Sequence, residues 1–438
     1  MKGMLLLIPL FLACCLAVSG CTGPVGPSVP STPAPSGTVT TATPVTPAAN
    51  LTPGAAVAGA DNRFAFSLYR SLIGQPENRN ANLFFSPFSL SSAFAVVYEG
   101  AGGTTADEIR SVFSYPGKKD DLRQGFQKID ALLDQPDAGY TLATANALWA
   151  EKTYAFLPGY LQTVREYYGA NETSMDFMGD PDGSRATINR WVEGKTHDRI
   201  KDLLPEGSID PLTRLVITNA VYFKGTWDLQ FDRNDTRPMD FRTLSGTTEQ
   251  VPMMVRTNRD TVYGYYETGE LQVLRMPYVR GNGTGLSMLV ILPRGDNLSA
   301  VEAALDPGML GDLRAGLVDE RVNVWIPRFN LTTRYSLTGT LSAMGMPSAF
   351  DPASADLSGM DGTRDLSVTG VFHQAFVEVN EQGTEAAAAT AVVAGFAVAR
   401  QEPPVPEFRA DHPFVFLVQD DETGAILFLG RVTDPVAG

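Results

Sequence analysis

The chain has 438 residues, of which 44% are hydrophobic, and this is ample for a large buried core. Its formal net charge is −15 and it contains no basic run, so the composition argues against a protein that binds nucleic acid. The three cysteines, Cys14, Cys15 and Cys21, all lie near the N-terminus, which predicts a folded part without disulfide bonds.

The N-terminus has the pattern of a targeting segment. Lys2 precedes an apolar stretch that is short for a membrane span, which needs roughly 20 residues. The letters VSGC, which end at Cys21, then match a lipobox. We therefore expect a lipoprotein signal peptide over residues 1–20, and a lipid on Cys21 that anchors the protein to the cell membrane outside the cytoplasm. An ordinary secretory signal cut elsewhere and an uncleaved anchor are the alternatives.

Residues 22–58 are rich in Thr, Pro, Ser, Gly and Ala and show no apolar periodicity. A chain of this composition cannot bury enough surface to offset the entropy of ordering. With Cys21, it predicts a disordered tether over residues 21–58. No linker or internal repeat follows, so residues 59–438 are predicted to form one domain, although the length alone suggests two or three.

Helical patterns crowd the first half of this domain. Asp61 is expected to cap a helix whose apolar face carries Phe64, Leu68 and Leu72. Ser86 and Pro87 begin a second, nearly apolar helix, because Ser is a good N-cap and Pro at the first helical position loses no hydrogen bond. A capping box at residues 105–108 begins a third helix, and further helical patterns cover residues 120–133, 158–168 and 185–199.

Strand patterns predominate later in the chain. Runs rich in β-branched and aromatic residues occur at residues 142–150, 213–224, 249–254, 261–266, 271–278, 286–293, 321–329 and 368–380. The final runs, PFVFLVQD and AILFLGRV, are joined by Glu422-Thr423-Gly424 and predict a hairpin. Helices that come early and strands that come late indicate the α+β class.

Residues 378–399 combine the features of a strand and of a loop. The alternate positions that are small or apolar and uncharged are Thr384, Ala386, Ala388, Thr390, Val392 and Ala394. One face of this segment can therefore be buried in a sheet. Because Ala is a poor strand former and the turn-rich QEPPVPEF follows, a loop is equally consistent with the sequence. Loops of this length are usually functional or disordered, and the patterning here favours a function.

Five motifs follow one another along the domain. They are NLFFSPFS at 82–89, NAVYFKGTW at 219–227, VNEQGTE at 379–385, DHPF at 411–414 and FLGR at 428–431. Together, and in this order, they resemble the serpins, a family of serine protease inhibitors. The resemblance extends from the helix predicted near Asp61 to the C-terminal hairpin.

The resemblance implies the serpin fold, in which helices pack around three β-sheets and an exposed reactive-centre loop, here about residues 382–405, can insert into the central sheet. It implies an inhibitor and not an enzyme. A target serine protease cleaves the loop, forms a covalent 1:1 complex with it, and is trapped as an acyl-enzyme when the loop inserts as a new strand. The expected protein is a monomer without cofactor or metal ion.

The resemblance also assigns roles to residues. The hinge of the loop would be Glu381, Gly383, Thr384, Glu385, Ala386, Ala387, Ala388, Ala389 and Thr390. The residues expected where the central strands part, in the shutter and breach regions, are Ser86, Ser89, Asn219, Trp227 and His373. Each of these also has a plainer interpretation, since Ser86 can simply cap a helix and Trp227 can be a large core aromatic.

The reactive bond is placed by counting the family's usual interval from Glu381. This puts Ala397 before the bond and Val398 after it, which would suit elastase-like or subtilisin-like proteases. A register one residue shorter puts Phe396 there and favours chymotrypsin-like proteases, and a longer loop would put Arg400 there. These alternatives stay open.

The competing interpretation is a non-inhibitory serpin that acts as a surface-tethered binding or chaperone-like protein. Such members typically carry charged or bulky residues in the hinge, whereas the hinge of this chain is small. Nothing in the sequence indicates an enzyme, because there are only three histidines (His197, His373 and His412) and no GxSxG, HExxH or P-loop motif.

Overall fold

The computed structural model describes residues 51–135, 139–170, 172–282, 284–383 and 404–437. The predicted signal peptide, Cys21 and most of the predicted tether lie outside these residues, and so does the loop over residues 384–403. The structure therefore tests the fold of the domain and the base of the loop, while the reactive bond stays a prediction.

The helices of the described part gather early in the chain. They are α1 (Pro53–Ile73), α2 (Pro87–Gly100), α3 (Gly103–Val112), α4 (Lys119–Leu133), α5 (Pro158–Tyr168), α6 (Pro181–Lys195), α7 (Leu298–Ala304), α8 (Pro307–Gly316), α9 (Thr338–Ala343) and α10 (Ser358–Asp361), with short 3-10 turns at Pro76–Asn78 and Pro347–Phe350. The start of α2 is as predicted, since Ser86 is its N-cap and the Ser86 hydroxyl oxygen accepts from the Ser89 amide at 3.2 Å.

The strands of the described residues form three sheets. The five-stranded sheet has the order β12 (Phe329–Ser336), β13 (Gly370–Val379), β4 (Leu215–Gly225), β2 (Tyr140–Glu151) and β3 (Glu172–Met175). The seven-stranded sheet has the order β1 (Leu83–Phe85), β16 (Ile426–Val432), β15 (Phe414–Asp420), β9 (Leu286–Pro293), β8 (Leu271–Pro277), β7 (Val262–Glu267) and β10 (Val318–Arg321). The four-stranded sheet has the order β14 (Glu407–Arg409), β11 (Asn323–Pro327), β6 (Thr248–Arg256) and β5 (Arg237–Arg242).

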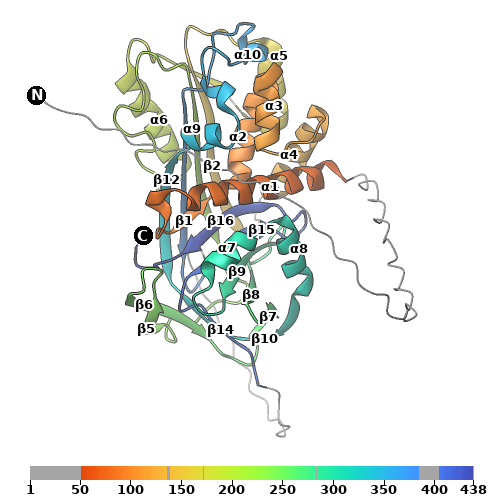
Figure 1. The fold of residues 1–438 in the computed structure, drawn as a ribbon, viewed down its shortest axis with the longest axis vertical. Coiled ribbons are helices and arrows are strands. Elements are labelled where there is room, and N and C mark those ends of the chain that lie inside the picture. The colour runs from red at the N-terminus through yellow and green to blue at the C-terminus, as the bar shows by residue number, and fades with distance from the viewer. Residues whose placement is uncertain (1–50, 136–138, 171, 283, 384–403, 438) are drawn as a thin grey trace, which may run out of the picture. The chain divides into compact units, whose positions relative to one another are not determined.

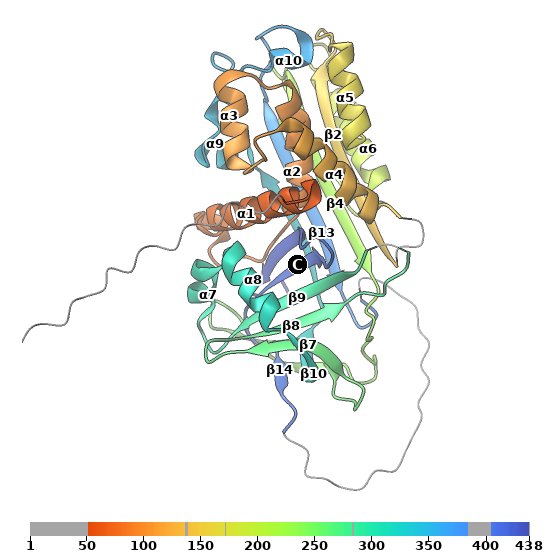
Figure 2. The same ribbon diagram turned by 90° about the vertical axis from the view of Figure 1, so that its right-hand side faces the viewer.

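Helices cover both faces of the five-stranded sheet. In Figure 1, α6 lies on one side of its long strands and α2 to α5 lie on the other. Because side chains alternate along a strand, Ile217 and Val221 of β4 join the main core below α2, while Val216 and Ala220 join a smaller core below α6. The sheet is therefore buried on two faces. Figure 2 shows α2 and α4 on the side of the sheet that faces the viewer.

The predicted α+β class and the C-terminal hairpin are confirmed, because β15 and β16 pair antiparallel. Several boundaries differ from the prediction. The first helix starts at Pro53 and not at Asp61, because Thr52 caps it and an Ala-rich stretch follows, so residues 53–58 belong to the helix and not to the tether. The third helix starts at Gly103, with Gly102 and not Thr105 as its N-cap and without a side-chain capping hydrogen bond. The helix predicted over 185–199 runs from Pro181 to Lys195, and the residues predicted as one strand over 321–329 are divided among β10, β11 and β12.

Asp61 lies in the middle of α1 and is wholly buried. Neither of its carboxylate oxygens has a hydrogen-bond partner, and burial raises its pKa well above the ordinary value. Asp61 therefore opposes folding rather than capping a helix.

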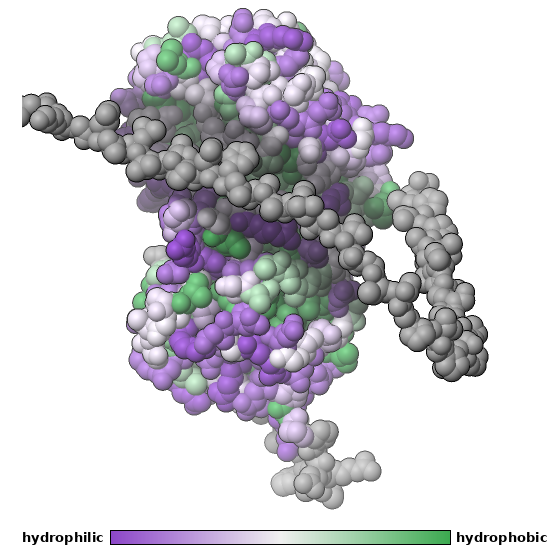
Figure 3. Space-filling model, in the orientation of Figure 1, coloured by the Kyte–Doolittle hydropathy of each residue, from purple (hydrophilic) through white to green (hydrophobic). Residues whose placement is uncertain are grey.

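The surface of the described part is largely polar. Figure 3 shows one face, on which hydrophilic residues predominate and hydrophobic ones gather in the region of α7 and α8. Within the ranges that the structure describes, no helix combines the length and the apolar character needed to cross a membrane.

Candidate functional site at the seam between β4 and β13

Two neighbouring inner strands of the five-stranded sheet, β13 and β4, run parallel to each other. β13 pairs with β4 from Gly370 opposite Val216 to Phe376 opposite Tyr222, and we call this boundary the seam. The outer neighbours are antiparallel, since β12 pairs with β13 and β2 pairs with β4 in that sense. A strand placed in the seam and running opposite to both partners would therefore have an antiparallel neighbour on each side.

The chain leaves β13 at one end of the seam and turns sharply there. The backbone carbonyl of Gln382 accepts from the Trp227 amide at 2.9 Å, and Gly383 forms a β-bridge with Thr226. Gly383 has a φ of +124°, and a Cβ at this position would lie 2.2 Å from the carbonyl oxygen of Gly225. Only glycine fits this turn, because of both the left-handed backbone and the close approach.

Glu381 fixes the base of the loop on the other side of the turn. It is only 2% exposed, its carboxylate accepts from the hydroxyl of Thr236 at 2.8 Å, and its carbonyl accepts from the Phe231 amide at 2.8 Å. The Arg328 guanidinium lies 3.7 Å from the same carboxylate. These contacts hold the position from which the loop departs.

Trp227 lies beside this turn, as the resemblance implies. Its indole N–H donates to the carbonyl of Asn380 at 3.0 Å, and its ring stacks on Tyr278 with centroids 4.5 Å apart. It is therefore both a buried aromatic and a hydrogen-bond donor to the base of the loop.

A polar row crosses the middle of the seam. His373 of β13 lies opposite Asn219 of β4, which in turn lies opposite Asn146 of β2, and Tyr335 of β12 lies opposite His373. The sequence predicted His373 and Asn219 but missed Asn146 and Tyr335. A single asparagine in the otherwise apolar run TANALWA is a weak signal, and only the register of the strands shows that it meets Asn219.

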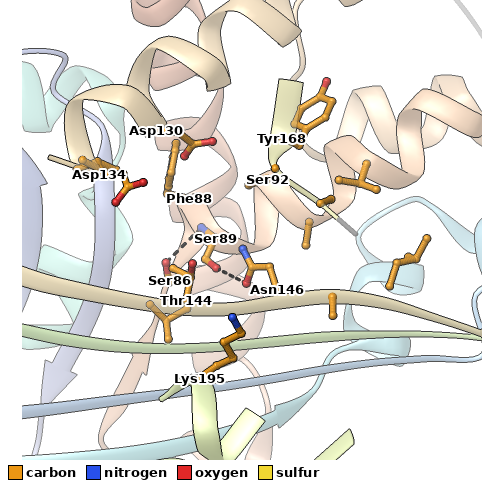
Figure 4. Close-up of a pocket in the computed structure, with 18 of the residues that line it drawn as sticks. Ser86, Phe88, Ser89, Ser92, Asp130, Asp134, Thr144, Asn146, Tyr168 and Lys195 are labelled. Atoms are coloured by element: carbon orange, nitrogen blue, oxygen red, sulfur yellow. Dashed lines mark hydrogen bonds between the residues drawn. The ribbon is translucent and has the colours of Figure 1, made fainter. Parts of the chain in front are cut away.

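Ser86, the N-cap of α2, and Ser89 in its first turn complete the row from the side of the helix. The Asn219 side-chain amide donates to the Ser89 hydroxyl and to the Asn146 carbonyl oxygen, both at 2.6 Å, and Ser89 donates to Asn146 at 2.9 Å. Figure 4 shows Ser86, Ser89 and Asn146 together below α2. The structure thus brings four of the five predicted shutter and breach residues into one network, and Trp227 lies apart at the end of the seam.

The ionisation of His373 follows from these contacts. Its Nε2 accepts from the backbone amide of Ser86 at 3.1 Å, so Nε2 carries no proton, and Nδ1 donates to Asn219. Burial lowers the pKa of His373 to about 3, because a proton on Nε2 would face an N–H group without access to water. Since the Ser86 hydroxyl donates to Leu427 and not to His373, this serine and histidine are not a nucleophile and its base.

A pH measurement tests the buried state of His373. In the unfolded chain the pKa of a histidine is near 6.5, whereas the pKa of His373 in the folded protein is about 3. The unfolded chain therefore binds a proton more readily, so the stability that neutral His373 contributes is fully present above about pH 6.5 and is lost as the pH falls toward 3. We expect the free energy of unfolding of the wild type, minus that of His373→Asn, to fall by about 1.4 kcal/mol per pH unit between roughly pH 6 and 4. Denaturant unfolding at each pH measures it, and a difference that does not change with pH would contradict it.

A cavity of about 870 Å³ adjoins the network on the side of α4 and α5. Ser89 and Asn146 form part of its wall, and Asp130 and Tyr168 face it from the helices (Figure 4). Burial, and to a smaller extent the nearby Asp134, raises the pKa of Asp130 to about 7. The polar row therefore borders a cavity that lies between the sheet and the helices α4 and α5.

Several predicted site residues lie outside the described part of the chain. They are the hinge positions Thr384, Glu385, Ala386, Ala387, Ala388, Ala389 and Thr390, the candidate reactive-bond positions Phe396, Ala397, Val398 and Arg400, and the lipidation site Cys21. No group of three or more His, Cys, Asp or Glu side chains that could hold a metal ion occurs in the described ranges.

Comparisons with known proteins agree with this geometry. The family model described as Serpin (serine protease inhibitor) matches residues 59–435. A serpin-like protein of Methanosarcina acetivorans is 40% identical over 86% of this chain and 88% of its own length, and the human leukocyte elastase inhibitor is 39% identical over 86% and 99%. The structure of human thyroxine-binding globulin with its ligand is 29% identical, covers 88% of this chain and 100% of its own, and superposes with a TM-score of 0.78. The chain therefore belongs to the serpin family.

Proposed function

We propose that this protein is an extracytoplasmic suicide inhibitor of serine proteases, which traps the acyl-enzyme by inserting its cleaved loop into the seam. One observation carries the proposal. β13 and β4 are direct parallel neighbours, and the loop departs from the end of β13 beside the open end of the seam. A cleaved loop that folds back there runs opposite to both strands and exchanges one parallel pairing for two antiparallel ones.

The energetics favour such a step. Insertion of about fourteen residues would add on the order of a dozen backbone hydrogen bonds, each worth ~0.5–1.5 kcal/mol. This sum is comparable to the whole net stability of a domain, roughly 5–15 kcal/mol. The native form would then persist because the barrier to insertion is high, and not because it is the most stable arrangement.

Cleavage supplies the event that lowers this barrier. The serine oxygen of the protease attacks the carbonyl carbon of Ala397, the bond to the nitrogen of Val398 breaks, and that nitrogen leaves with a proton. The protease is then joined to Ala397 through an ester, and rapid insertion would separate the ester from the catalytic machinery that hydrolyses it. Phe396 and Arg400 remain the alternative residues before the bond.

The place of action follows from the N-terminal segment. A lipid on Cys21, followed by a tether to the helix α1, would hold the domain at the outer side of the cell membrane as a monomer. Proteases that reach the cell surface are the targets that this arrangement favours. The similarity to the leukocyte elastase inhibitor supports an elastase-like target, and Ala397 would also suit a subtilisin-like one.

A non-inhibitory binding protein, surface-tethered or chaperone-like, is the second candidate. The similarity to thyroxine-binding globulin with its ligand favours this second candidate, because that globulin is a domain of the same fold that binds a small molecule. Apart from Glu385, residues 383–390 are small and uncharged, which favours the inhibitor, since a charged or bulky residue on the inserting face would obstruct insertion.

A denaturing gel separates the two candidates. The protein is incubated in turn with elastase-, subtilisin-, chymotrypsin- and trypsin-like proteases, each also in a form whose catalytic serine is blocked. We expect a band that resists denaturation with an active elastase- or subtilisin-like enzyme and with none of the blocked ones. The mass of the released C-terminal peptide should show that it begins at Val398. Loop cleavage by every enzyme without a stable band would contradict inhibition and favour the binding protein.

A further inference from the structure

The segment that follows α6 crosses the open end of the seam. It covers residues 196–204, and we call it the strap. Its far end is fixed, because Ile200, Leu203 and Leu204 are fully buried in the core below α6. The side-chain amide of Asn189 donates to the carbonyl of Leu204 at 3.0 Å, and the amide of Leu204 donates back at 2.8 Å.

One side chain of the strap touches both sides of the seam. The guanidinium carbon of Arg199 lies 5.9 Å from the ring centroid of Tyr222 and 5.6 Å from that of Phe376. These two rings are register partners, one on β4 and one on β13, and their centroids are 5.9 Å apart. Arg199 thus forms cation–π contacts with both strands that an inserting strand has to part.

The strap also reaches the outer strand. The carbonyl of Lys201 accepts from the Arg334 guanidinium of β12 at 3.2 Å, and the same guanidinium donates to the Gln374 side chain of β13 at 3.2 Å. On the other side of the seam, the His197 ring meets Tyr222 edge-on at 6.2 Å. The strap therefore contacts β12 and β13 on one side and β4 on the other.

The backbone of the strap is strained. Left-handed φ values at non-glycine residues occur in the described chain at Ser114 and at three positions of the strap, His197, Asp198 and Asp202, with φ of 52°, 60° and 51°. Such conformations persist only where the surroundings hold them, and they cluster at segments that move or bind. The three strained residues therefore indicate that contacts with the sheet hold the strap in its path across the seam.

The position of Arg199 along the seam determines at which stage of insertion its contact with the two rings is broken. Tyr222 and Phe376 are the last registered pair toward the end at which the loop leaves β13. A strand that enters from that end separates this pair first and reaches the row of His373 and Asn219 afterwards. The contact with Arg199 is therefore broken at the start of insertion.

We propose that Arg199 is a positioning residue which keeps β4 and β13 together at the end of the seam from which the loop departs. The strap thereby sets the rate at which a strand inserts. This inference rests on the proposed function, because it concerns the same insertion. Arg199 is exposed, and exposed cation–π contacts are modest, so its loss should speed insertion about 3- to 10-fold and not abolish the fold.

The test measures insertion without a protease. A fluorescent peptide with the sequence of residues 384–397 is added to the intact protein, and its uptake is followed by gel shift and fluorescence anisotropy. The variants are Arg199→Gln, which removes the charge, Arg199→Lys, which keeps it, and Arg190→Gln, which removes an exposed charge from α6 as a matched control. Unfolding in denaturant is measured for each, because a merely structural role would change stability and uptake together.

We expect Arg199→Gln to take up the peptide about 3- to 10-fold faster than the wild type, and Arg199→Lys and Arg190→Gln to stay within about twofold. Equal rates for Arg199→Gln and Arg190→Gln would overturn the role of Arg199 while leaving the proposed inhibition intact, provided that the wild type takes up peptide and forms the protease complex. A wild type that does neither would overturn both proposals.

Discussion

Cleavage between Ala397 and Val398 is expected to raise the melting temperature by roughly 10–20 °C. The reason is that the cut frees the residues after Gly383 to enter the seam, where the parallel pairing of β4 and β13 is exchanged for an antiparallel pairing of each with the inserted strand. A gain of ~10 kcal/mol, divided by an unfolding entropy of about 2 cal/mol/K per residue over a domain of about 375 residues, gives a shift of this size.

The measurement compares melting curves, followed by circular dichroism, before and after limited proteolysis of the loop. A protein that lacks residues 1–50 is the matched control, because it shows whether loss of the N-terminal segment alone changes the curve. An unchanged melting temperature in a sample whose loop is fully cleaved would mean that no strand is inserted, and the trapping mechanism would then be wrong for this chain.

Thr384→Arg is expected to turn the inhibitor into a substrate, with at least a tenfold loss of stable complex and little change in the rate of cleavage. Thr384 begins the alternation of small uncharged residues, so its side chain would be buried as the strand inserts. An arginine there would bring an unpaired charge into the sheet, which slows insertion until hydrolysis of the ester wins.

Glu385→Arg supplies the control for this substitution. It introduces the same side chain one position later, on the opposite face of the strand, where the wild-type chain already carries a charged side chain, so this variant should still form complex. The stoichiometry of inhibition, the number of inhibitor molecules consumed per protease inactivated, measures both variants. Full yields of complex from Thr384→Arg would contradict insertion of this face.

Local signals in the sequence predicted the fold well where neighbours in the chain are also neighbours in space. The cap of α2 at Ser86 and the hairpin of β15 and β16 are examples, because a cap or a tight turn is decided within a few residues. Asp61 shows the limit. It has the chemistry of a cap, but Thr52 and Pro53 begin the helix earlier, and tertiary packing buries the aspartate.

The parts of the site that were missed depend on contacts between distant segments. Asn146 joins the polar row only because β2 pairs with β4 in one particular register, and no pattern within β2 fixes that register. The strap was predicted as helix as far as Arg199, because Asp and His adopt left-handed backbone more often than most residues but far less regularly than glycine, so His197 and Asp198 are only a weak signal that the helix has ended.

The two buried groups with opposite perturbations, Asp61 and His373, have a joint consequence for the proton balance of folding. Burial lowers the pKa of His373, so the stability that this group contributes is lost as the pH falls from about 6.5 toward 3. Burial raises the pKa of Asp61, so the folded form of this carboxyl binds a proton more readily than the unfolded form and gains stability as the pH falls. The two slopes of stability against pH therefore have opposite signs, and where both groups titrate a change in the acidity of the surroundings alters the stability of the domain less than it would through His373 alone.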